Sequence, residues 1–182
     1  MARFLRTLLL ASILALPAAA LAKPVTLHGK TADVTLEVAG FVPTLGAGAL
    51  GGQYERLVQM QHVEAGKPAL IASVLVDTPP PGFDAKQLPQ HVLRSYKARF
   101  GKAVPAVTGT DQPPGFWFDF EETSVAGRSW NLYFETLAQG RWLEIHFSAT
   151  NPRPEELAGL RQLALSVVRT VTFVPRPVGA TK

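Results

Sequence analysis

Rings, carboxylates and an imidazole alternate with apolar residues along three segments in the C-terminal half of the chain. Alternate residues of a strand project to one face, so these segments would gather the polar and aromatic groups on one surface. The candidate site residues on it are Trp117, Asp119, Tyr133, Glu135, Trp142, Glu144 and His146. Rings supply contact area and polar groups fix orientation. The surface predicts a platform for a protein partner or small ligand; the alternative is a half-exposed face partly covered by a helix or loop.

Glu144 and His146 would lie on the same side of one strand. With Asp119 or Glu135 they could form a mixed oxygen and nitrogen metal site, or an acid-base pair for hydrolysis. The other three histidines are scattered, so a surface histidine beside an acid explains the pair equally well. A metal-dependent or acid-base hydrolase is therefore the alternative to a non-catalytic binding protein, for which we expect no cofactor.

Residues 46–51 match the dinucleotide fingerprint G-x-G-x-x-G, which needs a tight strand-to-helix turn in a parallel unit. Pro43 separates this stretch from the preceding strand, so a loop over 41–52 is expected instead. The chain has no serine elbow, H-E-x-x-H or P-loop motif. It also has no cysteine, which excludes disulfides, zinc-thiolate sites and a thiol nucleophile.

The platform segments form the clearest pattern in the chain. Three strands are expected at about 116–124, 128–137 and 141–149, joined by short glycine-containing links that favour antiparallel hairpins. This is a β-meander. Its opposite face would be the main core, made of Phe116, Phe118, Phe120, Trp130, Leu132, Phe134, Leu143, Ile145 and Phe147.

Two amphipathic helices complete the expected framework. One has apolar residues at every fourth position from Leu88 to Phe100 and ends at Gly101. The other follows Asn151 as N-cap and Pro152 as first residue, and its apolar stripe is Leu157, Leu160, Ala164, Val167 and Val168. Further strands are expected at 25–27, 34–38, 69–76, 104–110 and 170–174, and at 54–63, where a helix is the alternative. The fold class is α+β, an antiparallel sheet flanked by two main helices.

The order of these elements resembles that of the PsbP-like fold group, including exported bacterial proteins described as DcrB-like. The resemblance rests on the strand 70–76, the helix end 95–100, the strand 115–120 and the helix before 171–173. It implies an α/β/α sandwich. Members of this group have unrelated roles, so the resemblance implies no function and no site residue.

The N-terminus resembles a cleavable secretory signal. Arg3 and Arg6 precede an apolar run, and Ala20-Leu21-Ala22 is a small-x-small cleavage site. The run from Leu8 to Ala22 is shorter than the about 20 residues that span a bilayer. We therefore expect a signal peptide at 1–22, a single domain at 23–174, a flexible tail at 175–182, a periplasmic location and no transmembrane span after signal removal.

Charge argues against one class of partner. Without Arg3 and Arg6 the chain keeps 16 basic and 14 acidic side chains, a net charge of +2. No basic run is present that would follow a phosphate backbone. Nucleic acid is therefore not expected as a partner. The expected partner is an envelope protein or a small ligand.

Overall fold

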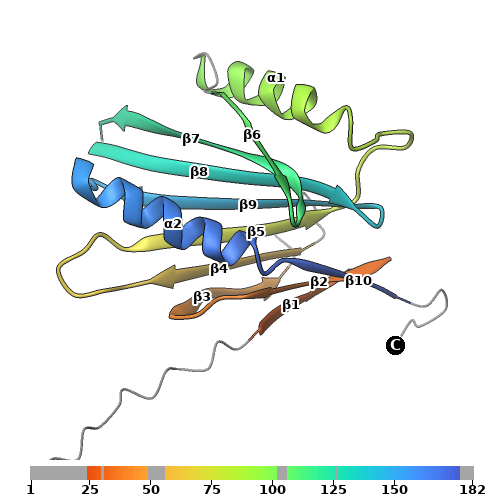
Figure 1. Ribbon diagram of the computed structural model, residues 1–182, viewed down its shortest axis with the longest axis horizontal. Helices are drawn as coiled ribbons and strands as arrows, with labels where there is room; N and C mark the ends of the chain where they lie inside the picture. Colours follow the sequence, from red (N-terminus) through yellow and green to blue (C-terminus); the bar gives the residue numbers. More distant parts are fainter. Residues whose placement is uncertain (1–23, 30, 49–55, 102–105, 126, 177–182) are drawn as a thin grey trace, which may run out of the picture.

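An antiparallel sheet forms most of the computed structural model (Figure 1). The structure describes residues 24–29, 31–48, 56–101, 106–125 and 127–176. The expected signal at 1–22 and most of the expected tail lie outside them. Seven strands are ordered β3-β4-β5-β9-β8-β7-β6, and every neighbouring pair is antiparallel. Their bounds are β3 Phe41–Gly48, β4 Arg56–His62, β5 Leu70–Asp77, β6 Thr108–Asp111, β7 Pro114–Ser124, β8 Gly127–Ala138 and β9 Arg141–Thr150.

The expected β-meander is confirmed as β7, β8 and β9. The link between β8 and β9 consists of Gln139 and Gly140, whose φ angles are both positive at 52° and 69°. A two-residue hairpin turn requires this backbone conformation because its twist matches that of the flanking strands. β4 is likewise a strand, so the helix alternative for 54–63 is wrong.

The loop expected at 41–52 is wrong for its first part, which is β3. Pro43 is tolerated because β3 is an edge strand, with one side free of ladder hydrogen bonds. The pairing with β4 shifts register at two places, which accommodates the irregular sequence. The first glycines of the G-x-G-x-x-G stretch thus lie in an antiparallel strand, the wrong context for a dinucleotide turn; Ala49 to Gly52 lie outside the described residues.

A second, three-stranded sheet contains β1 (Pro24–His28), β2 (Ala32–Glu37) and β10 (Thr172–Pro175), in the order β1-β2-β10. Both pairings are antiparallel. The expected C-terminal edge strand is confirmed, and its partner is the second strand of the chain. The first two strands therefore do not extend the large sheet; they cover the end of the main core.

Helix α1 (Leu88–Phe100) lies on one face of the large sheet. Its residues at four-residue spacing, Leu88, Val92 and Tyr96, are buried against the sheet. Gly101 ends the helix in the left-handed conformation, with φ 65° and its N–H bonded to Lys97 O.

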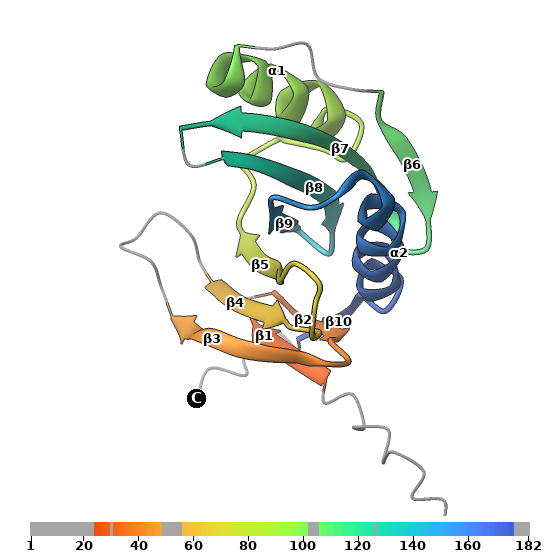
Figure 2. The same cartoon turned by 90° about the vertical axis from the view of Figure 1, so that its left-hand side faces the viewer.

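Helix α2 (Leu157–Val168) lies on the opposite face (Figure 2), so the predicted sandwich with one helix on each side is confirmed. Leu160, Ala164, Val167 and Val168 are buried as expected. They join the main core with β1, β2, β4, β5, β8 and β9. Within the part of the chain described here, no helix is both long and apolar enough to cross a bilayer.

The expected start of this helix is wrong. A short 3₁₀ segment, Pro154–Glu156, precedes α2, and Arg153 N donates to the Glu156 carboxylate at 2.7 Å. Asn151 has a positive φ of 50° and accepts a hydrogen bond from Arg128 N. Asn151 is therefore committed to the end of the β8–β9 hairpin, which delays the helix by several residues.

Candidate functional site

The strand register sorts the candidate residues between the two faces of the sheet. Tyr133 of β8 lies directly opposite Phe118 of β7 and His146 of β9. Directly opposed residues of antiparallel strands project to the same face. Phe118 therefore shares a face with Tyr133 and packs under α1, whereas we expected it in the main core. The expected assignment of β7 is wrong because both of its faces carry aromatic residues, so alternation alone does not orient it.

Trp117 and Asp119 consequently lie on the α2 side, away from the other five candidates. Trp117 packs against the main core. Asp119 Oδ2 accepts hydrogen bonds from Nε1 of the buried Trp130 and Nε of Arg161, each at 2.9 Å. The expectation that all seven residues share one platform is thus wrong. Asp119 thus links Arg161 of α2 to the buried indole of Trp130.

Asp119→Ala is expected to destabilise the fold by about 1–3 kcal/mol, because it leaves the Trp130 N–H buried without an acceptor. Chemical denaturation of purified protein measures the change. Arg161→Gln serves as the control: it removes a side chain that is 42% exposed, so its cost should stay at or below about 1 kcal/mol. Equal losses in the two variants would contradict this role of Asp119.

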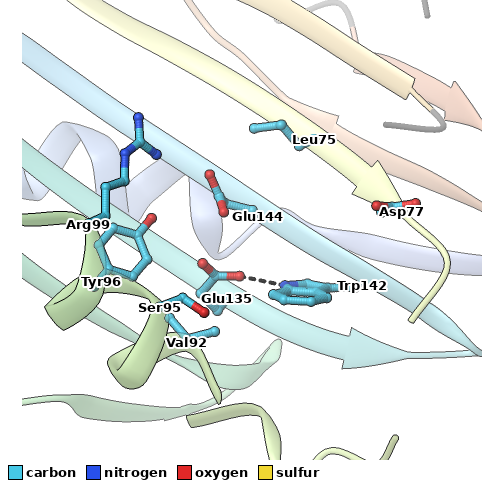
Figure 3. Close-up of a pocket in the computed structure, with 9 residues that line it drawn as sticks. All are labelled: Leu75, Asp77, Val92, Ser95, Tyr96, Arg99, Glu135, Trp142 and Glu144. Carbon is cyan, nitrogen blue, oxygen red and sulfur yellow. Dashed lines mark hydrogen bonds between the residues drawn. The ribbon is translucent and has the colours of Figure 1, made fainter. Parts of the chain in front are cut away.

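On the α1 side, Glu135 and Glu144 form a carboxyl pair, placed directly opposite each other on β8 and β9 (Figure 3). Glu135 is fully buried, and its Oε2 accepts a hydrogen bond of 2.7 Å from Nε1 of Trp142. Its Oε1 accepts no hydrogen bond from an N–H or hydroxyl group among the described residues. A proton shared between the two carboxyls forms a hydrogen bond from one carboxyl to the other. The structure thus brings Glu135, Trp142 and Glu144 together, as expected.

Burial controls the protonation of this pair. It raises the pKa of Glu135 well above its usual range, and the charge of Glu144 adds to the effect. Burial also raises the pKa of Glu144, while the hydrogen bond with Glu135 and the charge of Arg99 oppose the rise. Two interacting carboxyls titrate as a unit. The pair therefore retains a proton at higher pH than isolated glutamates do.

A cavity of about 210 Å³ lies between this pair and α1. β8 and β9 contribute Glu135, Trp142 and Glu144, and β5 and α1 supply the remaining walls. These further lining residues are Leu75, Asp77, Val92, Ser95, Tyr96 and Arg99. The cavity reaches the surface, because Ser95 and Arg99 are exposed.

None of the lining residues from β5 and α1 was predicted to be a site residue. They lie far from the meander in sequence and carry no motif of their own. A usable signal was the position of Arg99, three residues after Tyr96 and thus on the same side of the helix as the apolar stripe. This position predicts that the positive charge of Arg99 lies at the edge of the buried helix face, next to the residues that the helix covers.

His146 and Tyr133 form a stacked pair next to the cavity. Their ring centroids are 4.1 Å apart, and His146 Nε2 lies 3.0 Å from Asn131 Oδ1. Burial, assisted by Arg99, lowers the pKa of His146 to about 4, and burial raises the pKa of Tyr133 to about 12. Both side chains are therefore neutral near pH 7. Among the described residues, no group of three or more His, Asp and Glu side chains is placed to hold a metal ion.

Comparison with known proteins gives a likeness of fold. No protein-family model and no curated protein sequence matches the chain. Among solved structures, the chain is similar to LpqN of Mycobacterium tuberculosis, a protein involved in cell envelope biogenesis. The match has a TM-score of 0.44 and 12% sequence identity, and covers 84% of this chain and 91% of LpqN.

Proposed function

We propose that this protein is a non-catalytic binding protein that holds a small molecule in the cavity between α1 and the sheet. One observation carries the proposal: the fully buried carboxyl of Glu135 lies in the cavity wall, and among the described residues its Oε1 has no donor other than a proton shared with Glu144. Burying such a group is costly unless it is paired. A cavity with apolar walls and a few convergent polar groups is the usual form of a small-molecule site.

The structure favours a small ligand over a protein partner for this face. Tyr133 is only 4% exposed and Glu135 is not exposed at all, because α1 covers them. A protein surface therefore has no access to either side chain while α1 is in place. A small molecule can reach the pair through the opening beside Ser95 and Arg99.

The hydrolase expected as the alternative has less support. Glu144 pairs with Glu135, whereas His146 is engaged by Asn131 and by the ring of Tyr133. A histidine with a pKa of about 4 is a weak base near pH 7. The expected Glu144 and His146 pair thus lacks the mutual arrangement that acid-base catalysis needs.

The proposed site of action is the bacterial periplasm. This part of the proposal rests on the N-terminal sequence, where a basic start, an apolar run and a small-x-small site follow one another. A binding protein in that compartment would meet nutrients, envelope precursors and signalling molecules before they reach the inner membrane.

Ser95→Phe is expected to abolish retention of the bound molecule. Ser95 lines the cavity and is exposed, so a phenylalanine there fills the opening without removing a core contact. Native mass spectrometry of the protein, after incubation with envelope extract of its source organism, measures retention. Lys97→Phe is the matched control, because Lys97 is exposed on the same helix and lies outside the cavity lining. Equal retention by Ser95→Phe, or no retained molecule in the parent protein, would contradict the proposal.

A further inference from the structure

Among the charged residues that line the cavity, acids outnumber cations. Asp77, Glu135 and Glu144 line the cavity together with one cation, Arg99 (Figure 3). The most buried acid is Glu135, and among the described residues its Oε1 has no donor other than a proton shared with Glu144. An occupant that donates hydrogen bonds and carries positive charge satisfies this oxygen; an anionic occupant adds a further negative charge beside it.

We propose, building on the binding function above, that the occupant carries a compact ammonium group that lies between Glu135 and Glu144 and replaces the proton they otherwise share. An ammonium has three donors and no acceptor, which matches a site formed by two acceptor carboxylates. The rest of the molecule occupies the apolar part of the cavity along Leu75, Val92 and Trp142.

Each element packed around the pair is compatible with this exchange. α1 contributes Tyr96 and Arg99, β5 contributes Asp77, and the neighbouring strand positions hold Tyr133 and His146. Tyr96 is neutral because burial raises its pKa, so Arg99 and Asp77 are the charged neighbours. These two have opposite signs, so the charge balance of the site is set by the carboxyl pair.

The exchange conserves charge. The free site holds one proton on the carboxyl pair; on binding, that proton leaves to solvent and the positively charged ammonium takes its place. One proton is released for each amine bound, so the affinity rises by about tenfold per pH unit while the free pair holds its proton. Above the pH at which the free pair loses that proton, the affinity becomes independent of pH.

The cavity volume indicates the size of the occupant, and the aromatic wall indicates its chemistry. Trp142 is partly exposed to the cavity, and its outer neighbour Phe83 stacks on it at 5.9 Å between ring centroids. An indole face attracts cations as well as rings. An engineered cavity of about 150 Å³ holds benzene, so 210 Å³ suffices for one ring with an aminomethyl group. Benzylamine is therefore a suitable probe.

The experiment compares benzylamine with two probes of the same shape, the neutral benzyl alcohol and the anionic benzoate. Isothermal titration calorimetry on the protein expressed from the full chain, in two buffers of different ionisation enthalpy, gives affinity and proton release between about pH 6 and 8. Benzylamine is expected to bind at least about tenfold more tightly than either probe, with release of a proton. Ser95→Phe should abolish the binding.

The variant Glu135→Gln removes the proton that is exchanged. Benzylamine should then bind at least about tenfold more weakly and without proton release, whereas Glu122→Gln, outside the cavity, should change neither quantity. Preference for benzyl alcohol or benzoate in the parent protein overturns the ammonium inference and leaves the binding function standing. Benzylamine binding without proton release also overturns it. Absence of binding by all three probes overturns it as well, and the retention experiment with envelope extract then decides the binding function separately.

Discussion

Tyr133→Ala is expected to lower the free energy of unfolding by about 3–5 kcal/mol, the range for truncating a buried aromatic ring. The side chain is 4% exposed and lies between Phe118 and His146, with Tyr96 against its edge. Removing the ring leaves a cavity between α1 and the sheet that its rigid neighbours cannot fill. Urea denaturation followed by circular dichroism measures the loss.

Two comparisons make this prediction specific. Tyr133→Phe keeps the stacked ring and loses only the hydroxyl, so it should cost no more than about 1.5 kcal/mol. Trp142→Ala should cost less than Tyr133→Ala, because Trp142 is only partly buried. A folded Tyr133→Ala variant of unchanged stability would show that Tyr133 belongs to a binding surface and would restore the platform hypothesis.

Glu135→Gln is expected to stabilise the protein near neutral pH and to flatten its stability against pH. The folded-state pKa of Glu135 is raised above its unfolded value, so the folded protein binds more protons at intermediate pH. Stability is then complete below the unfolded pKa and falls as pH rises toward the folded pKa. The slope is at most about 1.4 kcal/mol per pH unit for one proton. Denaturation midpoints across a pH series test both effects.

Two controls assign the slope to the buried pair. Glu144→Gln should also reduce it, since the charge of Glu144 raises the pKa of Glu135. Glu122→Gln, at a position outside the cavity, should leave it unchanged. If the stability of Glu135→Gln changed with pH in the same way as that of the parent protein, Glu135 would have an ordinary pKa in the folded state, contrary to its complete burial.

Local sequence patterns predicted most of the framework. The helix that spans Leu88 to Phe100 was predicted together with its end at Gly101, because fourfold apolar spacing and a following glycine are both local signals. The meander followed equally well from its alternation and from its short links. β3 was missed because proline and glycine usually indicate a loop, and only its edge position explains how a strand accommodates them.

The candidate site was predicted in part for a related reason. Glu135, Glu144 and Trp142 lie on adjacent strands, so alternation and hairpin pairing sufficed to bring them together. Asp119 was misplaced because alternation separates the two faces of β7 but does not say which one α1 covers. Arg99 and Asp77 join the site through tertiary packing, which no short stretch of sequence encodes.

The pairing of β5 with β9 has a consequence for how the molecule acquires its cavity. Leu70 pairs with Ala149 and Asp77 with Trp142, so α1 and the strands β6, β7 and β8 form a single long excursion between the two paired strands. Contacts between segments so distant in sequence form slowly, because the chain entropy is lost before the contacts are gained. Both strands line the cavity. The cavity is therefore complete only once β5 and β9 are paired, and a molecule bound in it would stabilise that pairing.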